Sequence, residues 1–222
     1  MRKPTSIPIV NFTILLATIL SLSLLLSNAG DLALAQEDRN DDFTFKQPTP
    51  EQMQEAMGRW QATMQPTIYH QRLEYFVGEW DLAVKMWMGG PDSPPQDSRG
   101  EAETRWLFAG RWLVENFQSE VMGMPFNGFS LTGYDNYRRE YVGVWVDDMG
   151  TSMPTMSGRL DESGKVLTMY GEGDEPMTRE LGKQIKYVNR IVDEDTHVFE
   201  IHDLAIGGEN TMFMEITYTR KK

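Results

Sequence analysis

Two side chains near the end of the chain have the chemistry to bind an anion. Tyr218 and Arg220 stand two positions apart in the run Ile216-Thr217-Tyr218-Thr219-Arg220, so they would share one face of a β-strand. A phenol and a guanidinium that point into one cavity can hydrogen-bond a carboxylate or another anionic head group. The alternative is that Arg220 caps one end of the fold or lies in solvent.

A second group contains Tyr134, Trp145 and two aspartates. The run Gly133-Tyr134-Asp135-Asn136 is typical of a tight turn, and Asp147 follows Trp145 by two residues. Aspartates beside turn signals commonly accept hydrogen bonds from backbone amides, which favours a structural role for both. The functional alternative places Trp145 on an interior wall, with Tyr134 as a polar contact for a ligand.

Four glutamates fall in strand-like segments and are candidates for acid/base chemistry: Glu103, Glu115, Glu200 and Glu215. A carboxyl group that faces a dry cavity has the raised pKa that such chemistry requires. Tyr134 or Arg190 would be its partner in an enzyme. The sequence does not choose among the four glutamates, and it shows no nucleophile triad order or glycine-rich phosphate loop.

The sequence gives no reason to expect a metal or another cofactor. His197 and His202 are five residues apart on one predicted strand, so they face opposite sides and cannot form a two-histidine metal face. Methionine pairs such as Met86 and Met88 suggest Cu(I), but methionine more commonly fills irregular space in cores. Haem on a single histidine is a further alternative.

Composition and charge exclude several classes of protein. The chain has 222 residues, no cysteine and a formal net charge of −12. Without cysteine there is no disulfide framework, thiolate zinc site or cysteine nucleophile. The acidic balance argues against nucleic acid as a partner, because phosphate contacts need clustered Lys and Arg. Oligomeric state is not indicated.

The N-terminus has the pattern of a signal peptide. Arg2 and Lys3 precede an apolar stretch over residues 7–26, and Ala33 and Ala35 supply small residues before Gln36. We expect cleavage after Ala35, giving an exported protein, periplasmic or secreted, with no membrane attachment after cleavage. An uncleaved membrane anchor is the alternative, since the stretch is long enough to span a bilayer.

The mature chain divides into a leader, a helical segment and a long β region. Residues 36–49 are polar and contain Pro48, which predicts a flexible leader. Thr49, Pro50 and Gln52 form a helix-start signal, so residues 50–78 should hold two helices, 50–64 and 68–76. A methionine-rich stripe along the first helix is expected to pack against something larger.

From residue 79 onward the hydrophobic period changes to two. Trp80, Leu82 and Val84 alternate with polar residues, as in a half-buried strand. Similar runs continue to the end, without an intervening helix, which favours an antiparallel meander closed into a barrel. The predicted strands are 79–88, 101–109, 112–121, 129–134, 140–146, 153–160, 165–170, 184–192, 197–206 and 210–220.

Specific motifs support this prediction. Gly78-x-Trp80 opens the first strand as it does in lipocalins and their relatives. It is accompanied by His70-x-x-Leu73, Met122-Gly123-Met124-Pro125-Phe126-x-Gly128, Gly133-Tyr134-Asp135-Asn136, Trp145-x-Asp147 and the terminal Ile216-to-Arg220 run. Together these resemble the bacterial family known as domain of unknown function 1579, over about residues 69–220. The resemblance implies a calycin-like barrel and no established reaction.

The sequence therefore predicts an all-β protein: an antiparallel up-and-down barrel of about ten strands over residues 79–222, with a short N-terminal helical segment. A barrel of this size has room for one small apolar or amphipathic molecule. The residues expected to contact it are Tyr134, Trp145, Arg190, Tyr218 and Arg220. The alternatives are an acid/base enzyme and a packed scaffold or interaction protein.

Overall fold

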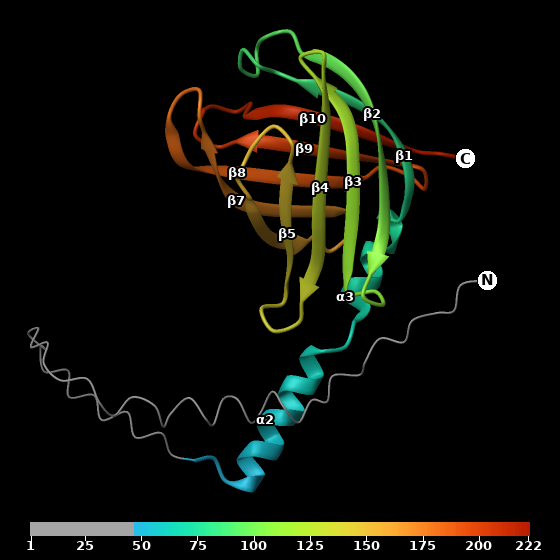
Figure 1. Cartoon of the computed structure of the whole chain (residues 1–222), viewed down its shortest axis with the longest axis vertical. Helices are drawn as coiled ribbons and strands as arrows, with labels where there is room; N and C mark the ends of the chain where they lie inside the picture. The colour runs from blue at the N-terminus through green and yellow to red at the C-terminus, as the bar shows by residue number, and fades with distance from the viewer. Residues whose placement is uncertain (1–46) are drawn as a thin grey trace, which may run out of the picture. The chain divides into compact units, whose positions relative to one another are not determined.

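A computed structural model describes residues 47–222, and these form an N-terminal helical segment followed by a β-barrel (Figure 1). The predicted signal peptide and nearly all of the predicted leader lie outside the described residues. The helices are α2 (Pro50–Thr63), α3 (Ile68–Gln71) and the 3₁₀ helix η1 (Arg72–Phe76). Among residues 47–222, no helix combines the length and hydropathy needed to span a membrane.

Ten antiparallel strands close into a barrel in which chain neighbours are also spatial neighbours. The strands are β1 (Gly78–Met86), β2 (Gln96–Leu107), β3 (Trp112–Val121), β4 (Met124–Asp135), β5 (Glu140–Asp147), β6 (Thr155–Leu160), β7 (Val166–Glu175), β8 (Glu180–Ile191), β9 (Thr196–Asp203) and β10 (Met212–Arg220). The last strand pairs with the first, with Trp80 opposite Arg220 and Leu82 opposite Tyr218. The predicted ten-strand meander is thus confirmed, and its closure leaves no unpaired sheet edge.

The start of α2 follows from its first residues. The Thr49 side chain accepts a hydrogen bond from the Gln52 amide, and the Gln52 side chain accepts one from the Thr49 amide. Pro50 occupies the first helical turn, where its missing N–H costs nothing. The capping box read from the sequence is present.

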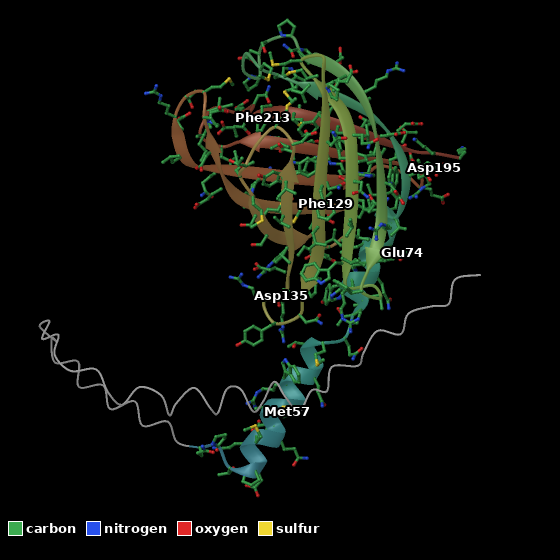
Figure 2. The ribbon with its side chains drawn as sticks, in the orientation of Figure 1. Met57, Glu74, Phe129, Asp135, Asp195 and Phe213 are labelled. Carbon is green, nitrogen blue, oxygen red and sulfur yellow. The ribbon has the colours of Figure 1, made fainter. Side chains whose placement is uncertain are left out.

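The expected packing of α2 is not observed. None of its residues is buried, and its stripe of Met53, Met57 and Trp60 remains exposed; Met57 is labelled on α2 in Figure 2. The C-terminal end of the helix is tethered instead, because Asn136 donates to the carbonyl oxygens of Thr63 and Gln65. Periodicity predicts which residues share a face, and it does not reveal whether a partner covers that face.

The short helix η1 closes one end of the barrel. Leu73 is buried there, and the Tyr75 hydroxyl donates to the carbonyl oxygens of Asp193 in the β8–β9 connection and of Thr196 at the start of β9. At the same end the Trp80 indole, 0% exposed, donates to the carbonyl oxygen of Phe76. Glu74, labelled in Figure 2, accepts from the indole of Trp106 on β2 at 2.5 Å. These bonds fix the helix across the strand ends.

Candidate functional site

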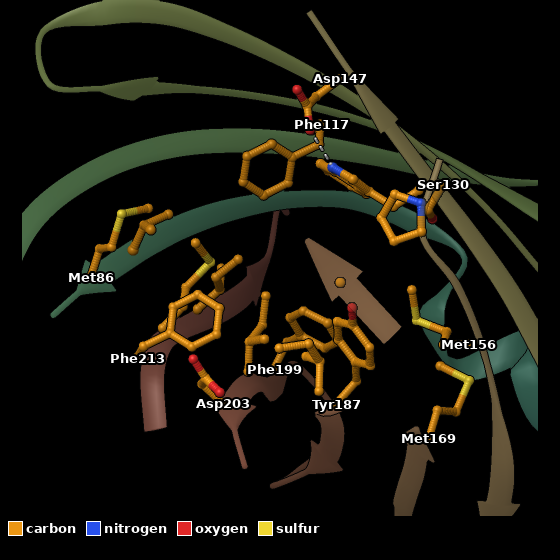
Figure 3. Close-up of a pocket in the computed structure, with 18 of the residues that line it drawn as sticks. Met86, Phe117, Ser130, Asp147, Met156, Met169, Tyr187, Phe199, Asp203 and Phe213 are labelled. Carbon is orange, nitrogen blue, oxygen red and sulfur yellow. Dashed lines mark hydrogen bonds between the residues drawn. The ribbon is translucent and has the colours of Figure 1, made fainter. Parts of the chain in front are cut away.

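The barrel encloses a cavity of about 1110 Å³ (Figure 3). Leu73 and Phe76 of η1 lie at its floor. Residues from the β1–β2, β5–β6, β7–β8 and β9–β10 connections, together with the end of β3, surround its opposite end, which forms the mouth. The volume is slightly above the roughly 300–1,000 Å³ of typical small-molecule sites. A barrel of ten strands therefore leaves usable interior space here.

Aromatic rings and thioethers make up most of the wall. Figure 3 shows Phe117, Tyr187 and Phe199 directed into the cavity, with Met156 and Met169 on one side. Tyr187 and Phe199 stack with ring centroids 6.3 Å apart. These side chains alternate with outward-facing residues along their strands, so the period of two that predicted the strands also lines the interior.

Glu115 on β3 brings an ionisable group into this apolar space. Its carboxyl accepts hydrogen bonds from the Thr104 hydroxyl at 3.3 Å and the Tyr218 hydroxyl at 3.4 Å. Burial raises the pKa of Glu115 to about 7, because the two hydroxyl donors stabilise the carboxylate less than water does. The carboxyl group thus titrates near neutral pH inside the cavity.

His197 on β9 stacks against Tyr218, with ring centroids 4.1 Å apart. Its Nδ1 lies 3.0 Å from the Oδ1 of Asn189, and Trp80 packs edge-on against the imidazole. Burial, reinforced by the positive charge of Arg220, lowers the pKa of His197 to about 3. The imidazole is therefore neutral. Its contact with Asn189 at Nδ1 is consistent with an N–H donated to the amide oxygen.

The Trp145 indole on β5 packs closely against Gly128 of β4. A Cβ atom at position 128 would collide with the indole ring, so a glycine is required there. The Trp145 Nε1 donates to the Oδ2 of Asp147 at 2.9 Å, while the Oδ1 of Asp147 accepts from the amides of Met149 and Gly150. Asp147 therefore holds both the indole and the β5–β6 turn in place.

An ion pair stands near the mouth. The Lys183 Nζ lies 2.5 Å from the Oδ2 of Asp203 and 3.2 Å from the Oε2 of Glu180. Asp203, which Figure 3 shows at the cavity wall, is buried. Hydrogen bonding to Asp203 raises the pKa of Lys183, so the ammonium stays charged and is matched by two carboxylates.

The structure brings two of the five predicted contact residues to the cavity wall, Trp145 and Tyr218. Tyr134 instead stacks on Tyr69 of α3, with centroids 4.6 Å apart. Arg190 is half-exposed and pairs with Glu200 at 3.1 Å. Whether any of these residues contacts a ligand stays a prediction.

Arg220 does not meet Tyr218 in the cavity. Its Nη1 and Nη2 donate to the carbonyl oxygens of Val77 and Tyr75, each at 2.7 Å. The guanidinium caps the closed end of the barrel, where Asp195 also lies 3.7 Å from its Nε. The capping alternative read from the sequence describes this position better than the anion grip does.

The sequence could have identified Glu115 among the four glutamates. Leu113 and Phe117, two residues to either side of it, are buried, so alternation places Glu115 on the same inward face. Glu103 is exposed, and Glu200 and Glu215 pair with Arg190 and Lys85. Asn189 and Lys183 carried no such signal, because their roles depend on contacts between strands.

Metal ligation finds no support in the part of the chain that the structure describes. Residues 47–222 contain no group of three or more His, Asp or Glu side chains arranged to hold a metal ion. His70 is buried on α3, where its Nδ1 accepts from the Thr67 amide at 3.0 Å. His202 lies 3.1 Å from Glu200.

One of two similar solved structures supports the barrel fold. The crystal structure of Rv2717c from M. tuberculosis matches with a TM-score of 0.51 and 16% identity, covering 71% of this chain and 100% of that one. A redesigned β-barrel, b11L5F_LGL, matches with a TM-score of 0.37 and 10% identity, covering 68% and 96%. No curated protein matches the chain.

A family model gives the assignment. The model described as "Protein of unknown function (DUF1579)" matches residues 65–220, which include α3, η1 and all ten strands. The match begins just after α2 and contains every residue of the cavity wall described above. This chain therefore belongs to the DUF1579 family.

Proposed function

We propose that this protein binds a small apolar or amphipathic molecule inside the barrel. The observation that carries the proposal is the cavity of about 1110 Å³, closed at one end by η1 and lined by aromatic and methionine side chains. Transfer of an alkyl chain from water into such a space contributes about 0.8 kcal/mol per CH₂. A closed sheet keeps the site preformed, so little ordering cost opposes binding.

The N-terminal pattern sets the proposed location. A signal peptide cleaved after Ala35 would deliver the barrel outside the cytoplasm, to the periplasm or the medium. A binding protein in that place would take up a sparingly soluble molecule and shield it from water. We infer no membrane attachment after cleavage and no nucleic-acid partner.

Native mass spectrometry of the mature protein, purified from its own host, is the direct test. A stoichiometric organic mass that is released on denaturation would support the proposal and give the ligand class. A mass of haem or copper would instead identify the cofactor alternatives. A ligand-free mass is followed by titration with N-phenyl-1-naphthylamine, a neutral dye that fluoresces in apolar surroundings.

A variant with a smaller cavity, compared with a surface variant, supplies the matched control for that titration. Ser130 of β4 lines the cavity and Asn116 of β3 is exposed. Ser130→Trp should take up part of the cavity and weaken dye binding, whereas Asn116→Trp should leave dye binding unchanged. Equal dye binding by both folded variants, or no binding by the unaltered protein, would overturn the proposal.

The second candidate is an enzyme, and Glu115 is the observation that favours it. A carboxyl on an apolar cavity wall with a pKa of about 7 is suited to exchange protons at neutral pH. Tyr218 would be its partner, since neither Tyr134 nor Arg190 reaches the cavity wall. Chemical conversion of the recovered ligand by the native protein, and not by Glu115→Gln, would favour this candidate. A packed scaffold loses support, because the interior is not filled.

A further inference from the structure

We propose that the cavity selects its ligand by charge: it takes molecules whose polar end is a protonated amine in preference to those that end in a carboxylate, with Glu115 as the partner of the ammonium group. The inference rests on the proposed function, because it names the ligand class for the same cavity. It reverses the expectation from Tyr218 and Arg220, which pointed to an anionic head group.

The first observation is that Glu115 has no cationic partner among residues 47–222. Its two hydrogen bonds come from hydroxyl groups, those of Thr104 and Tyr218. A carboxyl inside an apolar wall is costly to ionise unless an opposite charge or further donors compensate it. A ligand ammonium placed against the carboxylate would supply the missing charge.

The second observation is that the basic groups near the cavity are already engaged. Lys183, on the wall near the mouth, is held between Asp203 and Glu180. Arg220 lies behind the floor, bound to the carbonyl oxygens of Val77 and Tyr75. A carboxylate ligand would therefore have to break an existing ion pair or hydrogen bond to find a cation.

The third observation concerns the mouth. Its lining includes four carboxylates near the last residues of two strands: Glu120 on β3, and Glu172, Asp174 and Glu175 on β7. Negative charge around an entrance raises the local concentration of cations and lowers that of anions. Mouth and interior thus favour the same sign of ligand charge.

The inference predicts that Glu115 releases a proton when an ammonium ligand binds. Thr104 on β2, Ser130 on β4 and Tyr218 on β10 face Glu115, and His197 on β9 packs behind Tyr218. Burial and the neighbouring Glu115 raise the pKa of Tyr218 well above its ordinary value, and the pKa of His197 is about 3. Glu115 is consequently the group that titrates near neutrality here. Below about pH 7, binding of an ammonium ion would displace the carboxyl proton into solvent.

Competition against N-phenyl-1-naphthylamine tests the proposal with three probes that share one alkyl chain: dodecylamine, dodecanol and dodecanoate. We expect dodecylamine to displace the dye at a concentration at least about tenfold below that of dodecanoate, a difference of about 1.4 kcal/mol. Glu115→Gln should bring dodecylamine close to dodecanol. Glu103→Gln removes an exposed carboxyl from the neighbouring strand β2 and should leave the preference intact.

Calorimetry on the unaltered protein supplies a readout that needs no variant. At about pH 6, in buffers of different ionisation enthalpy, dodecylamine should release a proton and dodecanol should release none. Equal affinity for dodecylamine and dodecanoate, or amine binding without proton release, would overturn the inference while leaving cavity binding in place. If neither the dye nor dodecanol binds, the proposed function is wrong, and the inference about charge selectivity, which depends on it, is wrong too.

Discussion

The guanidinium carbon of Arg220 lies over the Trp80 ring, 4.1 Å from its centroid, and Trp80 is completely buried. Arg220 is on the last strand and Trp80 on the first, so this contact sits across the seam where the barrel closes. The hydrogen bonds from the same guanidinium to Val77 and Tyr75 join the seam to η1. One side chain thus fastens the first strand, the last strand and the floor.

Replacement of Arg220 by methionine should destabilise the fold and leave ligand affinity unchanged. The substitution removes two hydrogen bonds from a charged donor and a cation–π contact, a loss of about 2–4 kcal/mol. Urea unfolding followed by tryptophan fluorescence measures the loss. Arg190→Met, at a half-exposed ion pair, is the control and should cost about 0–1 kcal/mol. A similar loss for both would contradict the assigned role of Arg220.

Gly78→Ala should weaken the same seam. Gly78 has φ of +139°, and a Cβ atom there would lie 2.6 Å from the Nη1 of Arg220. The substitution combines backbone strain with displacement of the guanidinium, so we expect a loss of about 2 kcal/mol or more in the free energy of unfolding. Gly58→Ala on α2 meets no neighbouring atom and should leave barrel stability unaltered.

Glu115 should make the barrel less stable as pH rises. Its pKa of about 7 in the fold exceeds the value of 4.5 for a free side chain, so the native state binds more protons than the unfolded state between these values. Stability therefore falls as pH increases from about 4.5 to 7, by up to about 3 kcal/mol. The difference in unfolding free energy between the unaltered protein and Glu115→Gln, measured across this window, should follow that slope.

His197 should act in the opposite direction. Its pKa is lowered from 6.5 to about 3 in the fold, so the unfolded state binds the extra proton between these values, and stability falls as pH decreases through that window. The slopes from His197 and Glu115 oppose each other from about pH 4.5 to 6.5. In Glu115→Gln, the unfolding free energy should change with pH as His197 alone dictates. In His197→Gln, it should change as Glu115 alone dictates. A His197 signal that titrates near pH 6.5 in NMR would contradict this account.

Tyr218→Phe tests whether the phenol participates in ligand binding. The change removes the hydrogen bond to Glu115 and retains the ring that stacks on His197. We expect a further rise in the pKa of Glu115, because a donor to its carboxylate is lost, and weaker dodecylamine binding with little change for dodecanol. Unchanged affinity for both probes, in a folded protein, would exclude a direct role for the hydroxyl group.

Local signals in the sequence predicted the framework well. The capping box at Thr49 and Gln52 placed the start of α2, and the alternation of Trp80, Leu82 and Val84 placed β1. Strand ends near the mouth were predicted less well: β8 begins at Glu180 and β2 at Gln96. Both segments lack alternating apolar side chains, although Ser98 and Gly100 of β2 pair with the core residues Val84 and Leu82, so their sequence carries no hydrophobic period of two.

The candidate site was harder to predict, because its geometry depends on residues far apart in the chain. Tyr218 and Glu115 are 103 positions apart and meet only when the barrel closes. Arg220 was expected to point into the cavity with Tyr218, and the strand does place both inward. The carbonyl oxygens of Val77 and Tyr75 then bind the guanidinium at the floor. No local pattern in the sequence around Arg220 predicts that contact.

The pairing of β1 with β10 also constrains the order of assembly. Hairpins between neighbouring strands form from short segments, whereas the seam pairs residues 80–86 with residues 214–220 and must overcome the entropy of closing a long loop. The seam cannot form until β10, the nine residues Met212–Arg220, has been synthesised. A chain that stops short of them would expose the hydrogen-bonding edges of β1 and β9, which are templates for aggregation. The barrel can therefore close only after the C-terminal strand has been made.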